Sequence, residues 1–507
     1  MKTLLPLVQF LVQNCKKQDL ETAKKILSKD ELELFTGISQ FNFKTDIIAA
    51  QQIFGIKSNT PKYQKVKREL LNKLYSSIFL ITPSLKGFAK EIDDIVEVIK
   101  AGAIQNIVGY YQRKDLMMPI IEMNFDNAYK YFLHNEVLIM ANLLRLHYGI
   151  TEPNVSKQKY YSTIYANAIE DQYWENKASL YYESINLQFG KNKKVNKDLM
   201  VVEIEKYLQE LSPFEHKIRS LKFYRNFYNL NMVFHHIQNQ YEEVIHYCDK
   251  LLDYIETIGF PSIVIKRNTI RQKAEHLVLL SRYDEALVEM QKIINLESEG
   301  TSTWINAQKM LLLIYLNKQE YAKANVIIND LSNNPSYNRT VSAFKRQIAL
   351  IGVYLYIFRL MRIIPGFQED QKSEVKKYMN EYPEFGRDKS AMNVPIIIAQ
   401  LLEAIVLKRE GEVLDRIDAL KKYSSRYITK SDSIRSNCFI NMLLEVVRNG
   451  YHVVAIERHT KKYYTKLLAN PKLTSDEAAE VEFIPYEHLW EIIMNYLKNR
   501  RLQEARR

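Results

Sequence analysis

The chain has 507 residues, 47% of them hydrophobic and 26% charged, which is too long for one compact core and too apolar for extensive disorder. Glycine and proline are scarce, at 14 and 13 residues, which excludes a β-rich protein with its many turn glycines and predicts an all-α chain. The net charge of +12 permits an acidic partner such as nucleic acid, a peptide or a membrane surface, but it is too small to require one.

The first residues have two interpretations. A short apolar run from Leu4 to Val12 precedes Cys15 and loosely imitates a lipoprotein export signal. Asn14 is a poor residue to precede a lipidated cysteine, and Pro6 interrupts the run. We therefore expect a first amphipathic helix, with a degenerate export signal over residues 1–15 as the alternative.

Cysteine usage and hydropathy favour a cytoplasmic location. The 3 cysteines are far apart in the chain and offer neither a disulfide framework nor a metal-binding pair, which fits a reducing compartment. No stretch has the roughly 18 consecutive apolar residues of a transmembrane segment. We therefore expect a cytoplasmic protein with no transmembrane segment.

Residues 1–85 are expected to form a separate helical unit. Thr60 and Pro61 are a typical N-cap and first residue of a helix, and this helix is expected to end before Pro83. Its outer faces carry five basic residues: Lys62, Lys65, Lys67, Arg68 and Lys73. Short helices followed by a basic helix are typical of a helix-turn-helix-like module, so nucleic-acid binding by these residues is an alternative function. Because the five residues encircle the helix, a solvated helix is the preferred interpretation.

Residues 86–221 are expected to form helical hairpins. Long amphipathic helices are predicted over 92–111, 125–133 and 157–187, and the basic segment from Gly190 to Lys194 is predicted to be an exposed loop. The chain contains 34 tyrosines, a residue type that suits interfaces and base stacking. We expect most of these side chains to pack between helices.

Residues 222–335 contain three related segments. Each places a tyrosine three residues before a small or modest apolar residue on the same helical face: Tyr241 and Val244, Tyr283 and Ala286, Tyr321 and Ala324. The clearest copy adds Ala274, Leu277, Met290 and Ile293. This pattern resembles the tetratricopeptide (TPR) repeat, a hairpin of two helices. The tyrosines are 42 and 38 residues apart, whereas the family repeats every ~34, so the segments are TPR-like with longer helices or connections.

The resemblance implies an α-solenoid, because one hairpin cannot bury its own apolar face and must stack on neighbours. Further hairpins are expected over 336–470, with a turn near Gly411 and an irregular insertion over 366–388. Residues 471–507 are expected to supply a C-terminal capping helix after Pro485, followed by a basic tail from Arg500 to Arg507.

Catalytic motifs are missing from the sequence. The two closest glycines are Gly102 and Gly109, so no GxGxxG or Walker A loop exists, and there is no HExxH or GxSxG. Glu243 and His246 form one carboxylate–histidine pair at helical spacing, whereas a di-iron bundle needs two such pairs and two more carboxylates. We therefore predict that the protein is not an enzyme and has no cofactor and no metal site.

The resemblance also implies a ligand-binding face on the first helix of each hairpin. By register this face carries Asn226, Asn229 and His236 in the first copy, Asn268, Arg271 and Glu275 in the second, and Asn306, Lys309 and Asn317 in the third. An asparagine amide can hold an extended peptide backbone, and Arg or Lys can hold an acidic group. The predicted peptide-binding groove comprises Asn226, Asn229, His236, Asn268, Arg271 and Lys309. An ordinary polar helix surface is the alternative interpretation.

These observations favour a non-catalytic scaffold or adaptor that binds a partner protein or peptide on the solenoid surface. The alternative is a bacterial-type regulator, with a nucleic-acid-binding unit at the N-terminus and a TPR-like sensor arm. Neither the partner nor the oligomeric state follows from the sequence.

Overall fold

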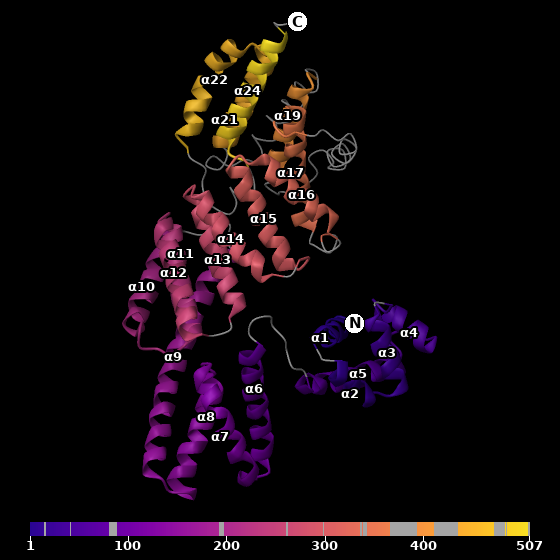
Figure 1. Cartoon of the computed structure of the whole chain (residues 1–507), viewed down its shortest axis with the longest axis vertical. Helices are drawn as coiled ribbons and strands as arrows, with labels where there is room; N and C mark the ends of the chain where they lie inside the picture. The colour runs from indigo at the N-terminus through magenta and orange to yellow at the C-terminus, as the bar shows by residue number, and fades with distance from the viewer. Residues whose placement is uncertain are drawn as a thin grey trace. The chain divides into compact units, whose positions relative to one another are not determined.

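The structure is a computed structural model that describes residues 1–14, 17–40, 42–80, 89–191, 197–259, 262–297, 299–334, 337, 342–365, 393–409, 434–470, 482 and 484–504. Every regular element in these ranges is a helix, which confirms the all-α prediction (Figure 1). Successive helices pack on one another along the chain, as in an α-solenoid. The insertion predicted over 366–388 and the turn predicted near Gly411 lie outside the described residues. None of the described helices is both long and apolar enough to cross a membrane.

The chain divides into two compact units. The first comprises Met1–Gln238 and Asp249–Lys266, and the second comprises Asn239–Cys248 and Arg267–Arg507. The boundary crosses α12 (Tyr241–Ile258) and α13 (Ile263–Leu279). The repeat-like segment 222–335 therefore contributes residues to both units.

The first unit begins with five short helices around a small apolar core. They are α1 (Leu4–Asn14), α2 (Lys17–Lys25), α3 (Lys29–Ser39), α4 (Asp46–Phe54) and α5 (Pro61–Ser77), followed by the 3-10 turn η1 (Ile78–Leu80). Leu4 and Leu11 of α1 pack in this core with residues of α3 and α5. The apolar run at the start of the chain is therefore an amphipathic helix, and Cys15 lies outside the described residues.

Local hydrogen bonds set the ends of these short helices. Ser28 and Glu31 form a capping box at the start of α3, and Gly55 ends α4 in the left-handed conformation that glycine adopts readily. α5 begins at Pro61, as predicted from the sequence. The Thr60 hydroxyl, however, donates to the carbonyl of Lys57 and makes no capping bond to the helix.

The rest of the first unit consists of longer helices. They are α6 (Ala89–Tyr110), α7 (Lys114–Lys130), α8 (His134–Leu146), the π-turn η2 (His147–Thr151), α9 (Val155–Lys191), α10 (Lys197–Leu211), η3 (Ser212–Phe214) and α11 (Leu221–Ile237). The helices predicted over 92–111 and 157–187 are confirmed, with ends that differ by a few residues. The helix predicted over 125–133 starts earlier, at Lys114, because α7 continues through Pro119.

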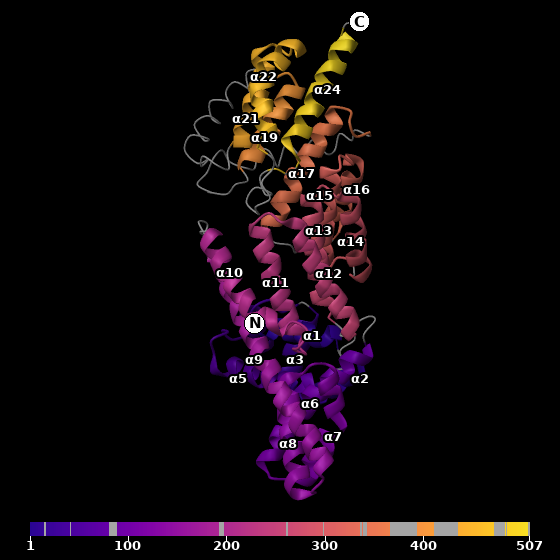
Figure 2. The ribbon, with the colours of Figure 1, turned by 90° about the vertical axis from the view of Figure 1, so that its left-hand side faces the viewer.

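Helices α6 to α9 pack as consecutive neighbours around their own core (Figures 1 and 2). Ile121 and Phe125 of α7 meet Met140 and Leu144 of α8 there. α7 packs on both α6 and α8, and α6 also contacts α8 directly. An open cavity lies among helices α6, α7, α8 and α9.

The second unit contains α14 (Tyr283–Leu296), α15 (Ser302–Asn317), α16 (Tyr321–Asn333), α17 (Ser342–Leu360), α19 (Asn393–Val406), α21 (Ile434–Arg448), α22 (Val453–Leu468) and α24 (Tyr486–Glu504). Its large apolar core runs from α15 to α24, and α19, α21, α22 and α24 lie together in both views (Figures 1 and 2). The helix predicted after Pro485 is α24. It extends to Glu504, so most of the predicted tail is helical, and Arg500 donates to the carbonyl of Val406.

Several hairpins close with the same backbone turn. One residue takes the left-handed conformation, and the N–H of the next residue donates to the carbonyl five positions earlier, as in a Schellman motif. These bonds are Arg113 to Val108, Leu133 to Ala128, Arg282 to Leu277 and Glu320 to Tyr315. The left-handed residues are Gln112, Phe132, Ser281 and Gln319, and none of them is a glycine. The hairpins therefore need few glycines, which explains the unusual composition.

The left-handed conformation of Gln319 leads us to expect that glycine at this position makes the protein more stable than glutamine does. A residue with a Cβ in the left-handed region costs about 1 kcal/mol, and Gln319 is exposed with a φ of 63°. We expect Gln319→Gly to raise the free energy of unfolding by up to about 1 kcal/mol in urea denaturation. Gln319→Ala is the control, because alanine keeps the Cβ and should give no gain. Equal effects of the two substitutions would contradict this explanation.

Candidate binding surfaces

The predicted groove residues of α11 lie in the first unit and are only partly accessible. Asn226 is 1% exposed, and its side-chain amide donates to Ser179 Oγ of α9 at 2.8 Å. Asn229 and His236 are half-buried. The assignment of Asn226 to a ligand-binding face is therefore wrong, because its amide joins α11 to α9.

The other predicted groove residues lie in the second unit on α13 and α15. Asn268 and Arg271 are exposed, and Lys309 is half-buried. The Arg271 guanidinium pairs with Glu275 one turn further along α13, at 2.5 Å. This surface pair is solvated and contributes little to stability, so Arg271 can exchange Glu275 for another acidic group.

A buried carboxylate connects the starts of these two helices. Glu297 accepts a hydrogen bond from Arg267 of α13 at 2.6 Å and another from Thr303 of α15. Burial opposes the ionisation of Glu297, but the bonds from Thr303 and Arg267 outweigh it and lower the pKa of this carboxyl. The arrangement fixes where α13 and α15 begin relative to each other.

Two of the five basic residues on α5 have partners inside the N-terminal helices. Lys67 lies 2.8 Å from Asp46, and Lys73 lies 2.7 Å from Glu31. Asp46 also accepts hydrogen bonds from the Tyr63 hydroxyl and the Met1 amine at 2.7 and 2.6 Å. Burial opposes the ionisation of Asp46, but these bonds outweigh it and lower its pKa to about 2.

The remaining three basic residues of α5 are exposed. Lys62 lies over the ring of Phe54 at 4.6 Å, Lys65 is 3.9 Å from Glu69, and Arg68 faces solvent. These three side chains are available to phosphate groups, whereas Lys67 and Lys73 hold the N-terminal helices together. The basic set therefore combines two structural residues with three surface residues.

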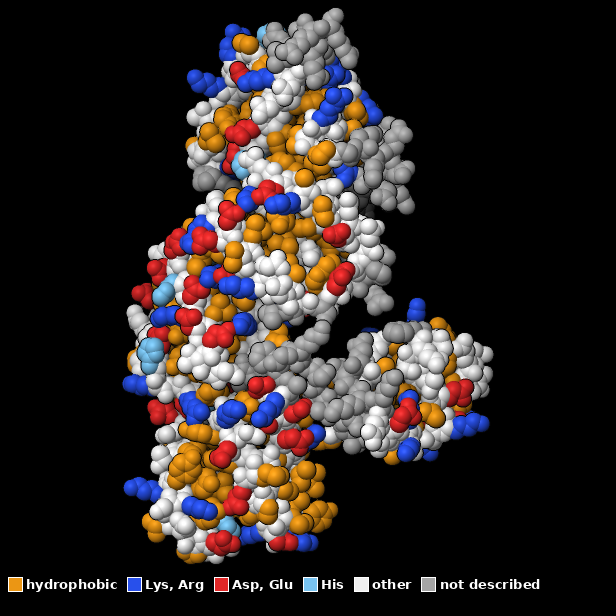
Figure 3. Space-filling view, viewed as in Figure 1, with side chains coloured by type: hydrophobic (Ala, Val, Ile, Leu, Met, Phe, Trp, Pro, Cys, Tyr) orange, Lys and Arg blue, Asp and Glu red, His pale blue; other side chains and the backbone are white. Residues whose placement is uncertain are grey.

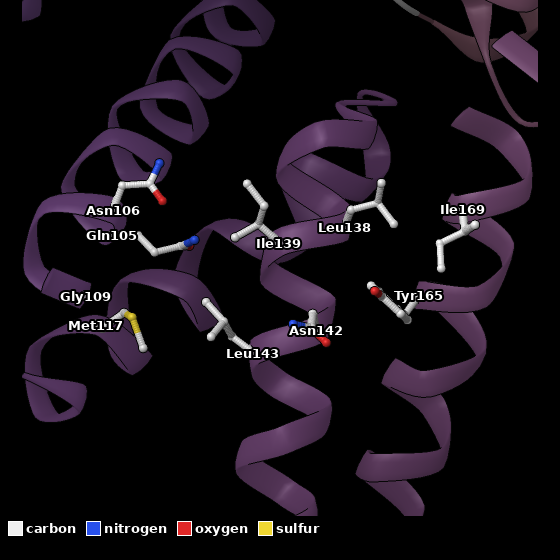
Figure 4. Close-up of a pocket in the computed structure, with 10 residues that line it drawn as sticks. All are labelled: Gln105, Asn106, Gly109, Met117, Leu138, Ile139, Asn142, Leu143, Tyr165 and Ile169. Carbon is white, nitrogen blue, oxygen red and sulfur yellow. The ribbon is translucent and has the colours of Figure 1, made fainter. Parts of the chain in front are cut away.

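An open cavity of about 480 Å³ lies among α6, α7, α8 and α9 (Figure 4). It is lined by Gln105, Asn106 and Gly109 from α6, Met117 from α7, Leu138, Ile139, Asn142 and Leu143 from α8, and Tyr165 and Ile169 from α9. The lining is mainly apolar, with three side-chain amides and one phenol, and none of these ten residues is charged. Such a site can bind an uncharged, largely apolar group, and it offers no acid or base for proton transfer.

Gln105 supplies an unsatisfied acceptor at this cavity. Its side chain extends from α6 toward α8 in Figure 4, and the residue is only 3% exposed. Its Oε1 atom has no hydrogen-bond partner among the described residues. Because a buried acceptor normally has a donor, the unpaired oxygen marks Gln105 as an incompletely satisfied side chain of this lining.

Exposed apolar side chains occur both in the cavity lining and elsewhere on α6. Ile139 and Ile169 line the cavity and are exposed, whereas Ile104, Ile107 and Tyr110 are exposed on α6 outside the lining. Figure 3 shows hydrophobic side chains gathered on the surface of the α6–α9 segment. An exposed apolar region of this kind is typical of an interaction site.

The sequence of α6 carries one signal for contacts on more than one side of this helix. Val98, Ala101 and Gln105 form the buried stripe of α6, while Ile104 and Ile107 form a second stripe that faces solvent. A helix with apolar residues on two faces needs a second partner. The amides of α6 meet α8 and α9 only because of how the four helices pack. The sequence pattern of one helix does not specify which other helices it packs against.

Comparison with known proteins adds no functional assignment. No protein-family model matches the chain, and no match was found among curated proteins or solved structures. Across the ranges that the structure describes, no group of three or more His, Cys, Asp or Glu side chains is placed to hold a metal ion. The all-α, repeat-like fold and the geometry of its surfaces therefore carry the functional proposal.

Proposed function

We propose that the chain is a non-catalytic scaffold or adaptor that binds a segment of a partner protein in the cavity among α6, α7, α8 and α9. The observation that carries this proposal is an apolar, uncharged lining that contains the unpaired Oε1 atom of Gln105. Apolar side chains of the partner would fill the cavity, and a backbone N–H would donate to Gln105. Buried apolar anchors supply most of the free energy of such interfaces.

We also propose that the hairpins of residues 222–335 are TPR-like. Tyr241, Tyr283 and Tyr321 are the first residues of α12, α14 and α16. The residues three positions later, Val244, Ala286 and Ala324, are fully buried, and so is Ala274 on the preceding helix α13. Small buried residues at these positions let two helices approach closely, which is what a TPR-like hairpin needs.

The polar face of α13 and α15 is proposed as a second contact surface for an acidic partner segment. Asn268 and Arg271 are exposed there, and Lys309 is half-buried. A cytoplasmic location is proposed for a separate reason: Cys248 and Cys438 are both buried cysteines outside any disulfide, as expected in a reducing compartment.

A peptide-display selection on the full-length protein tests the proposed cavity. We expect the selected peptides to share uncharged apolar residues. Ile139→Asp should weaken their binding by at least about 10-fold, because a carboxylate would then have to be buried against apolar groups of the peptide. Gln105→Leu should also weaken binding without lowering the melting temperature, because it removes an unsatisfied buried acceptor. Isothermal titration calorimetry gives both affinities.

Leu199→Asp is the matched control. Leu199 is 68% exposed on α10, compared with 43% for Ile139, and it does not line the cavity. The control should keep the affinity of the unmodified protein. Peptides that bind all three variants with the same affinity would place the binding site elsewhere and contradict the proposal.

A further inference from the structure

A second cavity in the first unit, of about 340 Å³, is built quite differently. It lies where the start of α8 and the middle of α9 meet the connection that leads into α11. Its polar lining includes His134, Glu170, Asp171, Lys217 and Arg219. Positively and negatively charged side chains therefore line the same small cavity.

Arg219 is held in place without using its side-chain donors. Its guanidinium lies 4.0 Å from the ring centroid of Tyr129 and 5.0 Å from that of Phe132. Only its backbone N–H is bonded, to Asp171 at 3.0 Å, and no described residue accepts a hydrogen bond from the guanidinium. A guanidinium that aromatic rings orient in this way is suited to a carboxylate, which it can bind through two parallel bonds.

His134 adds a second unpaired group at the same cavity. It is the first residue of α8, its side chain is 9% exposed, and its Nε2 atom has no hydrogen-bond partner in the described part of the chain. The Oε2 atom of Glu175 is 3.7 Å away, beyond hydrogen-bond distance, and already accepts a bond from Ser220. The imidazole is therefore free to bond with a ligand in the cavity.

Two more charged residues of the lining, Lys217 and Glu170, form no ion pair within the described part of the chain. Lys217 lies over the ring of Phe214 at 5.7 Å, and Glu170 is exposed on α9. Neither forms an ion pair with any residue that the structure describes, although both line the same cavity. Asp171, the other acid of the lining, is already engaged, since it accepts the Arg219 N–H. Glu175 does not line the cavity and lies 3.4 Å from Lys222.

We propose that this cavity binds a small zwitterion of amino-acid size, with its carboxylate on Arg219 and His134 and its ammonium group facing Glu170. A simple anion would leave Glu170 unpaired, and a simple cation would leave Arg219 and Lys217 unpaired. A molecule with both charges pairs with both walls of the cavity. The site is separate from the cavity that the proposed scaffold function uses, and its test is independent of that function.

The test screens the twenty common amino acids against the full-length protein by thermal shift and then measures hits by calorimetry. We expect at least one amino acid to bind saturably at a single site. Its N-acetyl and carboxamide derivatives, which each remove one charge, should bind at least about 10-fold more weakly. If no amino acid binds, or if the derivatives bind equally well, the proposal is wrong.

Arg219→Gln should reduce the affinity for the amino acid at least about 10-fold. Arg145→Gln is the matched control, because Arg145 also lies over a tyrosine, Tyr165 at 4.8 Å, but does not line this cavity. Circular dichroism checks that both variants fold. Binding that Arg219→Gln leaves unchanged would overturn the assignment.

Chemical labelling tests the same site in the unmodified protein, so that a folding defect in the variant does not decide the result. Phenylglyoxal modifies arginine side chains, and mass spectrometry reads the modified positions. The bound amino acid should slow modification at Arg219 and leave Arg145 unaffected. Equal rates at Arg219 with and without the amino acid would count against the proposal.

Discussion

Replacing Glu482 with glutamine is expected to lower the free energy of unfolding of the second unit by about 3–5 kcal/mol. Glu482 and Arg435 are both almost fully buried and form a two-bond ion pair at 2.7 and 2.9 Å. Burial opposes the charge on Arg435, but Glu482 and Glu487 outweigh it and raise the pKa of the guanidinium. The substitution removes one charge and leaves the other buried with an incomplete set of partners.

The position of Glu482 explains why this effect should be large. Arg435 also donates to the carbonyls of Leu467 and Asn470, and Glu482 accepts the backbone N–H of Tyr486. The pair therefore joins the start of α21, the end of α22 and the start of α24. A defect at this point should loosen all three helices together.

Urea denaturation followed by circular dichroism measures the change. Arg448→Gln is the control, because the Arg448 side chain is 50% exposed and pairs with Glu445 within one turn of α21 at 2.9 Å. Such surface pairs contribute about 0–1 kcal/mol. A loss from Glu482→Gln no larger than the loss from the control would show that the buried pair is not a determinant of stability.

Replacing Lys73 with methionine is expected to destabilise the N-terminal helices by roughly 2–4 kcal/mol at pH 7. The Lys73 amine lies 2.7 Å from Glu31, whose side chain is 1% exposed. Burial opposes the ionisation of Glu31, but the bonds from Lys73 and Ser28 outweigh it and lower the pKa of this carboxyl. Without Lys73, the buried carboxylate keeps only Ser28 as a partner.

The pH dependence of this effect has a definite sign. Because the pKa of Glu31 is lowered by folding, its stabilising contribution is present above its ordinary pKa of 4.5 and is lost as the pH falls below that value. The difference between Lys73→Met and the unmodified protein should therefore shrink in acid. Thermal melts at pH 7 and pH 3.5 measure this difference.

Lys65→Met separates this structural role from a role in nucleic-acid binding. Lys65 lies on the same helix, but its contact with Glu69 is long, at 3.9 Å, and both side chains are exposed. We expect this control to change stability by less than about 0.5 kcal/mol. Suppose that Lys73→Met and Lys65→Met both leave the melting temperature unchanged and both weaken DNA binding. That result would favour nucleic-acid binding by α5 and would contradict a structural role for Lys73.

The hairpins could be predicted because their signals are local. Tyr241, Tyr283 and Tyr321 mark the start of a second helix in each pair, and Pro61 marks the start of α5. These features depend on backbone conformation and on residues a few positions apart. The left-handed turns had no such signal, because residues such as Gln319 replace the glycine that usually identifies them.

The surfaces were harder to predict because their partners are distant in sequence. Helical register assigns Asn226 to a ligand-binding face, but its amide bonds to Ser179, 47 positions earlier. The same periodicity assigns Lys73 to an outer face of its helix, but its partner Glu31 is 42 positions earlier. The cavity at Gln105 depends on how α6, α7, α8 and α9 pack together. Helical periodicity identifies one buried face of a helix and cannot supply these pairings.

Photo-crosslinking in cells tests the central claim most directly. A benzoylphenylalanine residue at position 139 faces the proposed cavity among α6, α7, α8 and α9, and the same residue at position 199 serves as the exposed control. The scaffold proposal predicts one discrete crosslinked partner protein from position 139 and none from position 199. No crosslink from position 139, or the same products from both positions, would contradict it.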